Sequence, residues 1–537
     1  MAFSRGRREV SGPWGLRLAA GSVVALFSIP FGYLLVQNAS EADTFWRTIS
    51  APEALAPLGW SLLLAVAVSI AATVLGTGAA WITTRTDVPG RRLWRILLPL
   101  PLVIPSFIGA FVFLTAFAPG GLLETMLAPL GVERLRPFHG FWGSFFVLTL
   151  FTYPYVFLPA AARLAQLPSS LEESARLLGT SSYKTFWRVV LPQSRGAIGA
   201  GTLLVFLYSI SDFGVVQLMR YDTLTRVIYA TRLFDRSTSL ALSLQLGLLA
   251  VAVVVLERFV ARGTLRADLR RTQRPLQLSL RGLLKPAAFA AIVALVTAAL
   301  IVPIAVLLWW SLRGLRAGTM TAGELLTEMA DLTGPVLNTS GAALAAALAA
   351  VAVVLPVAYL SVRHRSHLAG GANAVIVGGF ALPGLVVALS FVFWVLSAPG
   401  LGFLYQTLPL LVLAYVVHFG AQSLRTAQVA VAGIPRNVED AARSLGADRW
   451  RRLVRVDLPL MRPALLSGAG IVLLSTMKEL PATLILAPAG FQTLAMKIWS
   501  ATQSAIFVNA SLASLMLILL SGFLTWALVI RGTTVAR

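Results

Sequence analysis

The stretch PSSLEESARLLGTSSYKTFWRVVLP (Pro168 to Pro192, the first loop) decides the fold, because it returns in the second half of the chain as PRNVEDAARSLGADRWRRLVRVDLP (Pro435 to Pro459, the second loop). The two copies align without a gap, and Gly179 of the first meets Gly446 of the second. A segment that repeats at a fixed offset indicates two copies of one structural unit. The sequence therefore predicts a chain built from two similar halves.

The composition around these loops is typical of a membrane protein. Of the 537 residues, 57% are hydrophobic and 12% are charged, and the mean hydropathy is +0.80. Soluble proteins contain about 25% charged residues. Cysteine is absent, which excludes disulfides and thiolate metal sites. We therefore expect an all-α polytopic membrane protein.

Twelve stretches are apolar over the roughly 20 residues that a helix needs to cross a bilayer. Those of the first half lie near 18–36, 59–83, 96–117, 141–162, 197–217 and 239–256. Those of the second half lie near 287–310, 340–361, 371–396, 405–424, 464–486 and 508–530. Because six spans return the chain to its starting side, the two loops face the same side and the halves are parallel repeats.

A basic segment separates the two halves. We expect a first six-span unit at residues 1–262, a basic cytoplasmic linker at residues 263–286 and a second six-span unit at residues 287–537. The plainer interpretation of the linker is that its arginines set the topology. Contact with anionic lipid or with a partner is the alternative.

The net charge of +22 follows the loops instead of gathering on one face. Assigning alternate loops to the two sides puts 33 of the 44 Lys and Arg residues on the side of the N-terminus and 10 on the other. By the positive-inside rule, the first side is the cytoplasm. We therefore expect a multi-pass protein of the bacterial inner membrane, in contact with lipid, with both termini cytoplasmic and no nucleic-acid partner.

Each loop predicts two short helices joined by a turn. Ser170 and Glu173, like Asn437 and Asp440, have the spacing of a capping box, and a glycine follows each first helix. A Leu-Pro pair is expected to close the second helix before the next span. Exposed aromatic and aliphatic residues among arginines suit a groove on another protein, and an amphipathic loop lying on lipid is the alternative.

The two loops resemble the coupling loop of ABC importer permeases, in which E-A-A is followed by a glycine and then by Leu-Pro. The matching positions are Glu173, Ala175, Gly179, Leu191 and Pro192 in the first loop, and Asp440, Ala441, Ala442, Gly446, Leu458 and Pro459 in the second. Ser174 replaces the usual first alanine, and Asp440 replaces the usual glutamate. The resemblance implies a fused pair of type I importer permease units, whose loops seat in an ATPase subunit and transmit its closure to the pore.

The substrate is implied by a second resemblance. Residues 477–483 (MKELPAT) resemble the ferric-iron branch of these permeases, while the first half has Ser211-Asp212-Phe213-Gly214 at that place. The resemblance implies iron(III) delivered by a periplasmic binding protein. Thiamine or another small solute remains the alternative, because fused chains of similar length occur in the thiamine branch as well.

Three charged residues fall inside predicted spans. Asp212 and Glu479 follow their respective loop glycines at the same distance along the chain, and Lys478 adjoins Glu479. Charged groups within a span are costly, so we consider these residues as a substrate path or outer gate. The alternative is a local pair in which Lys478 neutralises Glu479. His418 is expected to make a hydrogen bond between helices, and no metal site is expected.

No ATP-binding motif is present, because the four lysines lack the GxxxxGK[ST] context of a phosphate-binding loop. We therefore expect no catalytic residue and no bound cofactor in this chain. ATP and magnesium would be bound by separate ABC ATPase subunits, in two copies because the two loops are so similar. An ion-gradient-driven secondary transporter and an integral membrane enzyme are the competing function classes.

Overall fold

The computed structural model describes residues 13–131, 135–261, 278–318, 321–364, 367–525 and 527. Within these ranges the chain is helical and contains no strand, only one isolated bridge between Thr86 and Leu278. The all-α prediction is confirmed. Residues 263–277 of the predicted linker lie outside the described residues.

Ten helices in the described part of the chain are long and apolar enough to cross a membrane. Two further pairs reach that length only together, and each pair is bent. Arg91–Val103 meets Ser106–Ala116 at 92°, and His367–Ala381 meets Gly384–Ser397 at 106°. With each bent pair counted as one span, the candidates number twelve, as predicted.

The spans predicted at 96–117 and 371–396 are therefore each a bent pair of helices, a shape that the sequence analysis did not predict. Pro105 and Pro383 occupy the breaks, with ψ angles of 143° and 142° that are extended rather than helical. A proline inside a helix lacks the N–H that the helix needs, and its ring clashes with the preceding turn. A hydropathy profile does not reveal such a bend, because the residues on both sides of the proline are apolar.

Contacts divide the chain into two compact units, and each unit draws on both sequence halves. The Gly323 unit comprises Met1–Phe45, Gly323–Ser500 and Met516–Arg537, and the Trp46 unit comprises Trp46–Ala322 and Ala501–Leu515. The first candidate span thus belongs with the second half of the sequence. The boundaries at 1–262, 263–286 and 287–537 stay a prediction about the sequence repeat.

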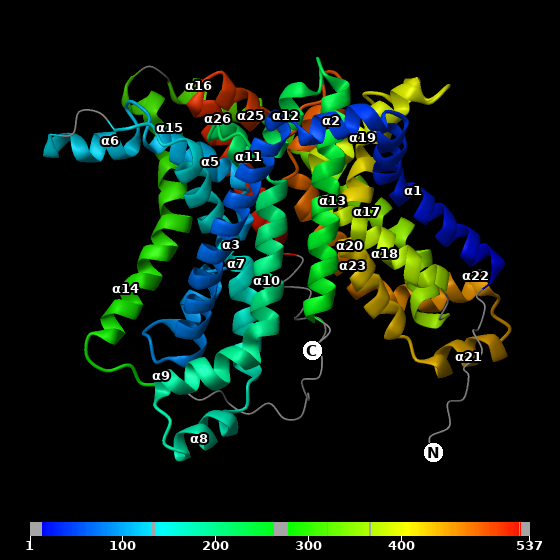
Figure 1. Ribbon diagram of the computed structural model, residues 1–537, viewed down its shortest axis with the longest axis horizontal. Helices are drawn as coiled ribbons and strands as arrows, with labels where there is room; N and C mark the ends of the chain where they lie inside the picture. The colour runs from blue at the N-terminus through cyan, green and yellow to red at the C-terminus, as the bar shows by residue number, and fades with distance from the viewer. Residues whose placement is uncertain are drawn as a thin grey trace. The chain divides into compact units, whose positions relative to one another are not determined.

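The Trp46 unit has α3 (Pro52–Arg85), α7 (Gly140–Gln166) and α10 (Leu191–Ser211) at its centre. Its other longer helices are α5 (Ser106–Ala116), α13 (Arg236–Ala261), α14 (Leu284–Val296) and α15 (Val302–Arg316). α3, α7 and α10 pack on one another (Figure 1). Two hydroxyls hold α3 to α10, since Thr73 Oγ1 and Thr202 Oγ1 are 2.6 Å apart. The short elements are α4 (Arg91–Leu97), α6 (Leu122–Leu127), α8 (Ser169–Leu177), α9 (Ser182–Thr185), α11 (Gly214–Leu218) and α12 (Leu224–Thr231).

The described end of the linker is tied to the loop that follows α3. Leu278 N–H donates to Arg85 O at 2.8 Å, and Leu280 N–H donates to Asp87 Oδ1 at 2.9 Å. Lys285 Nζ donates to Asp87 Oδ2 at 2.8 Å, and this bond lowers the pKa of the Asp87 carboxyl. The start of α14 is thereby fixed within the Trp46 unit.

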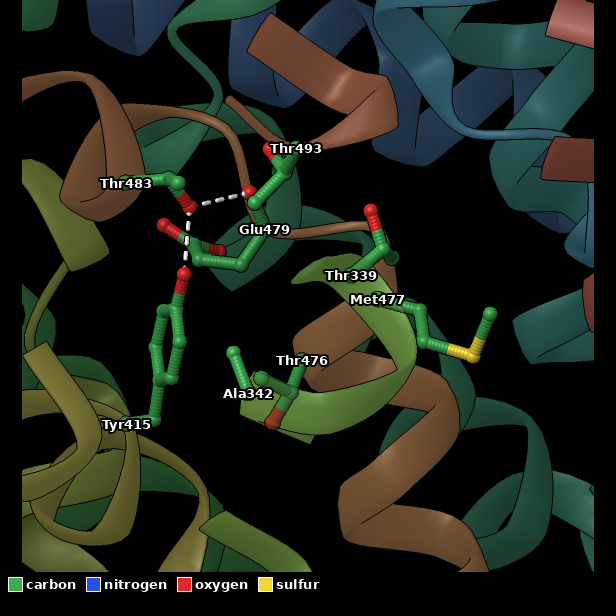
Figure 2. A pocket seen from close by; sticks show the side chains of 8 residues that line it. All are labelled: Thr339, Ala342, Tyr415, Thr476, Met477, Glu479, Thr483 and Thr493. Atoms are coloured by element: carbon green, nitrogen blue, oxygen red, sulfur yellow. Dashed lines mark hydrogen bonds between the residues drawn. The ribbon is translucent and has the colours of Figure 1, made fainter. Parts of the chain in front are cut away.

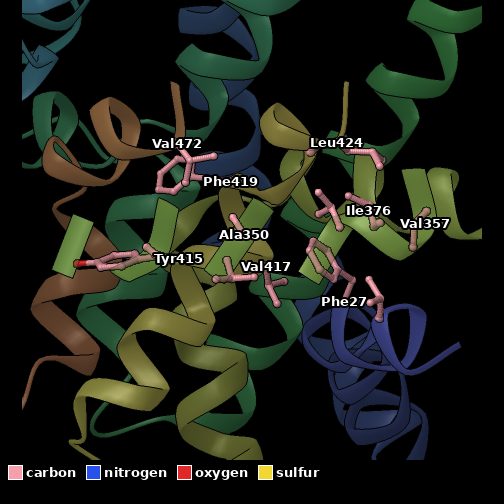
Figure 3. Packing of buried hydrophobic residues seen from close by; sticks show 14 of the residues in the cluster. Phe27, Ala350, Val357, Ile376, Tyr415, Val417, Phe419, Leu424 and Val472 are labelled. Atoms are coloured by element: carbon pink, nitrogen blue, oxygen red, sulfur yellow. The ribbon is translucent and has the colours of Figure 1, made fainter. Parts of the chain in front are cut away.

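The Gly323 unit has its core where α17, α20 and α23 meet (Figure 3). Its longer helices are α1 (Trp14–Ser40), α17 (Thr333–Arg363), α18 (His367–Ala381), α19 (Gly384–Ser397), α20 (Leu408–Ala432) and α23 (Leu458–Met477). α1 packs on α17, α18 and α19, and its Phe27 is 1% exposed within this core. The short elements are α21 (Arg436–Ser444), α22 (Arg449–Arg452), α24 (Pro481–Leu486) and α25 (Leu494–Gln503). Four helices extend across the unit boundaries: α2 (Ala42–Ser50), α16 (Ala322–Ala330), α25 and α26 (Phe507–Thr525).

Candidate functional site

The first loop is a compact pair of helices at one end of α7 and α10 (Figure 1). α8 ends in a left-handed turn, where Gly179 has φ +81°. Gly179 N–H donates to Arg176 O at 2.9 Å, and Thr180 N–H donates to Ala175 O at 3.2 Å. Only glycine enters this conformation at little cost, so the turn that the sequence predicts is present.

The second loop repeats this construction. α21 also ends in a left-handed turn, where Gly446 has φ +77°, and Ala447 N–H donates to Ala442 O at 3.0 Å. Ala442 is buried, as expected of the side of the helix that faces the body of the unit. The backbone hydrogen bonds match those of the first loop residue by residue.

The predicted capping boxes are wrong. α8 and α21 begin one residue after Pro168 and Pro435, and neither N-terminus has a side-chain cap. Ser170 therefore lies inside its helix instead of preceding it. The side chains of Glu173 and Asp440 are exposed and turn away from the unit to which they belong.

The residue before each of these acids turns inward and makes an ion pair, which in the first loop is buried. Glu172 Oε1 lies 2.6 Å from Arg85 Nη1, and these side chains are 5% and 1% exposed. Arg85 is the last residue of α3, and its Nη2 also donates to Leu167 O at 3.4 Å. The pair therefore joins α8 to the end of α3.

An equivalent pair holds the second loop. Glu439 Oε1 lies 2.7 Å from Nη2 of Arg363, the last residue of α17. The same nitrogen donates to Ile434 O at 2.7 Å. The sequence reasoning missed both pairs, although two signals were present: tandem acids in each loop, and an arginine just after the spans predicted at 59–83 and 340–361.

The base of the second loop has a further buried acid. Asp457 is fully buried, and its Oδ2 accepts from Tyr359 OH at 3.0 Å and from Arg452 Nε at 3.2 Å. Arg452 Nη1 also lies 3.6 Å from Glu439 Oε2. One ionic network therefore links α17, α21 and the helix that leads to α23.

The base of the first loop has uncharged residues at the equivalent positions. Val190 aligns with Asp457 in the sequence repeat and is buried, as is Thr185, the counterpart of Arg452. The rings of Trp81 and Phe186 meet edge to face, with centroids 5.6 Å apart. Ring packing replaces the ionic network there.

The second helix of each loop runs into the following span without a break, so the predicted stop at Leu-Pro is wrong. A π-helical turn, Phe186–Val190 or Leu453–Asp457, connects it to α10 or α23. Leu191 N–H donates to Phe186 O, five residues back. This wider turn gives room to Pro192, which has no N–H and would crowd a regular helix.

The tips of both loops expose large apolar side chains. Leu177 and Leu178 are 88% and 85% exposed, and Leu445 and Trp450 are 88% and 73% exposed. Exposed leucine and tryptophan side chains on a short, rigid helix pair are typical of a protein docking surface.

Asp212 lies just past the end of α10, in a break of the chain rather than inside a helix. The predicted span of 197–217 is therefore wrong beyond Ser211, where α10 ends. Asp212 Oδ2 accepts from Ser106 Oγ at 2.6 Å, and Oδ1 accepts from Val215 N–H at 2.8 Å. The carboxylate thus binds the start of α5 and the start of α11 together.

Glu479 has the same place in the Gly323 unit. α23 ends at Met477, so the single helix predicted at 464–486 is also wrong, because Pro481 starts α24. Glu479 Oε1 accepts from Ala482 N–H at 3.0 Å, and Glu479 O accepts from Thr483 Oγ1 at 2.6 Å. Lys478 forms the C-terminal cap of α23.

A pocket opens beside Glu479 (Figure 2). It is lined by Thr339, Ala342, Tyr415, Thr476, Met477, Glu479, Thr483 and Thr493. The hydroxyls of Tyr415 and Thr483 are 2.6 Å apart in its wall. The pocket is narrow and holds no space for a water molecule.

His418 of α20 is hydrogen-bonded to the backbone of Leu382, in the break between α18 and α19. The imidazole therefore connects two elements, in agreement with the predicted hydrogen bond between helices. In the ranges that the structure describes, no three His, Asp or Glu side chains gather as metal ligands would.

Comparison with known families gives one match, which occurs in both halves. Residues 72–266 and 355–531 match the family described as "Binding-protein-dependent transport system inner membrane component". Both ranges include a loop, its following span and the carboxylate beyond that span.

Three similar proteins are transport permeases by name. The chain is 28% identical over 501 residues to the Fe(3+)-transport system permease protein FbpB 2 of Haemophilus influenzae, covering 92% of this chain and 94% of that protein. It is 25% identical over 437 residues to the probable ABC transporter permease protein y4fN of Sinorhizobium fredii, covering 78% and 77%. The sulfate transport system permease protein CysT of Escherichia coli is 30% identical over 208 residues, which cover 38% of this chain and 74% of that protein.

Proposed function

The chain belongs to the family of binding-protein-dependent transport system inner membrane components, and on this premise we propose that it carries iron(III) through the membrane as the permease subunit of an ATP-driven importer. It is a multi-pass membrane protein and a transporter subunit. We further propose its partner proteins, its orientation in the membrane and its cargo.

The observation that carries the proposal is the pair of equally built loops. Each presents an outward acid, Glu173 or Asp440, and exposed leucines on a helix pair that an ion pair fixes to its unit. Two such surfaces suit two copies of one partner, an ABC ATPase subunit that binds ATP and magnesium. The loops and both termini then lie in the cytoplasm, as the distribution of basic residues predicts.

A continuous helix offers a route from each loop to the span. From Phe186 the chain stays helical to Ser211, and from Trp450 it stays helical to Met477. A displacement of either loop by the ATPase would therefore reach Asp212 or Glu479 at the far end without a hinge at Leu-Pro. In this proposal, ATP closes the partner, the loops move together, and the path opens outward to a periplasmic binding protein.

Iron(III) is the cargo favoured by the similarity that extends along nearly the whole chain, which is to a Fe(3+) permease. Sulfate is a second candidate, because sulfate permeases match one half of the chain. Thiamine is the third candidate cargo.

Reconstitution in proteoliposomes with the partner ATPase and binding protein would test the proposal. We expect ATP-dependent uptake of radioactive iron(III), without uptake of sulfate. Gly179→Pro/Gly446→Pro should release the ATPase on purification, because proline cannot adopt a positive φ. Gly179→Asn/Gly446→Asn is the matched control, since asparagine tolerates that region. ATPase retention by the proline variant would refute the role of the loops, and sulfate uptake would refute the cargo.

A further inference from the structure

We propose that Asp212 with Ser106, and Glu479 with Gly384, form two length-matched latches that hold the bent helix pairs closed against the broken spans. The inference rests on the proposed function only for its role in transport. The latches themselves are defined by contacts within each unit, and their test needs neither substrate nor ATP.

The first latch joins three elements of the Trp46 unit. Ser106 is the first residue of α5, and it donates to Asp212 Oδ2 at 2.6 Å while accepting from Tyr208 OH of α10 at 2.9 Å. Asp212 Oδ1 is occupied by Val215 N–H. Asp212 is 9% exposed. Both of its carboxylate oxygens are therefore committed to holding α5 and α11 at the end of α10.

The second latch uses a longer acid and a smaller partner. Gly384 is the first residue of α19, and a Cβ added there would lie 2.5 Å from Glu479 Oε1 and 3.4 Å from His418 Nε2. Glutamate therefore occupies the space that a serine side chain would need. It still reaches Ala482 N–H at the start of α24.

The two latches correspond position by position. Ser106 follows Pro105 at the first bend, and Gly384 follows Pro383 at the second. Glutamate is one methylene longer than aspartate, and glycine is shorter than serine by the whole side chain. The lengths therefore compensate, which is expected where each half must close the same gap between a bent pair and a broken span.

The latches join helices that are buried within their units. α5 and α19 are buried along most of their length, so neither can move away from its neighbours without exposing apolar surface. The pocket beside Glu479 holds no space for water. We infer that the latches stabilise this closed arrangement and that each must break when its bent pair moves.

The absence of cysteine makes the test direct, because a single introduced thiol is the only reactive one. Ser209→Cys and Thr476→Cys are equivalent probes, since the two positions align in the sequence repeat. Both residues are buried, at 3% and 4% exposure, and neither hydroxyl has a hydrogen-bond partner among the described residues. The measurement is the rate at which a maleimide labels each cysteine in detergent-solubilised full-length protein.

For the first latch, S106G and D212E are each made in the Ser209→Cys background and then combined. Each single change should raise the labelling rate about tenfold, the effect of losing one hydrogen bond to a charged group on a local opening equilibrium. The double variant S106G/D212E copies the second latch and should return to the parent rate. Leu177→Cys, at an 88% exposed position, should label quickly in every background.

For the second latch, G384S and E479D are combined in the same way in the Thr476→Cys background. Retention volume on size-exclusion chromatography identifies any variant that fails to fold, and the other latch then supplies the test. Single variants that label like the parent would overturn the proposal. Single variants that label fast, without recovery in either double variant, would overturn the length matching. Failure of iron uptake with intact recovery would instead count against the proposed cargo alone.

Discussion

The two loops have the same backbone conformation, but different side chains pack at their base. Both have the glycine turn, the inward glutamate and the arginine at the end of a long helix. Beneath the first loop lie the rings of Trp81 and Phe186, while beneath the second lie Asp457 and its partners. The backbone is therefore set by the residues that the two loops share, and it forms over a base of rings as well as over a base of ions.

The largest expected difference comes from the two arginines. Arg85→Ala should lower the free energy of unfolding by about 3–5 kcal/mol, because it leaves Glu172 charged, buried and without its ion-pair partner. Arg363→Ala should cost about half as much, since Arg452 stays 3.6 Å from Glu439. Titration with SDS, followed by tryptophan fluorescence, measures both. Equal losses would mean that Arg452 gives Glu439 no compensation.

The next effect concerns Asp457. Asp457→Val should cost about 2–3 kcal/mol, because Arg452 and Tyr359 lose the carboxylate that accepts their hydrogen bonds. Arg452→Thr/Asp457→Val copies the residues of the first loop and should cost less than the single change. The same titration applies. A double variant less stable than Asp457→Val would show that an uncharged base does not suit the second loop.

A smaller effect is expected at Tyr359. Tyr359→Phe removes one hydrogen bond to a carboxylate and should cost about 1–2 kcal/mol. In the Asp457→Val background the same change should cost almost nothing, because the acceptor is already gone. A full cost in both backgrounds would place the contribution of Tyr359 in packing rather than in the ionic network.

The smallest effect on stability is expected at the tips. Leu178→Ser and Leu445→Ser should change the free energy of unfolding by less than about 0.5 kcal/mol, since both side chains are exposed. Each should nevertheless reduce the amount of ATPase that co-purifies with the detergent-solubilised chain. Unchanged co-purification in the double variant would separate these leucines from the partner interface.

Much of the architecture was predictable because its causes are local. The long apolar stretches gave the candidate spans, and Gly179 and Gly446 gave the turns. The bends at Pro105 and Pro383 were missed because apolar residues continue on both sides of each proline. The capping boxes were wrong because Pro168 and Pro435 are the N-cap residues, so that each helix starts two residues earlier than expected.

The sequence by itself determined the number of candidate membrane spans and the repeated loops, since hydropathy and a glycine turn depend on a few neighbouring residues. Only the tertiary structure decided that Glu172 and Glu439 turn inward while Glu173 and Asp440 stay exposed. It also decided that α1 packs on α17, α18 and α19. Such choices depend on contacts between residues far apart in the chain, and the hydropathy of a single segment contains no information about which distant surface will cover it.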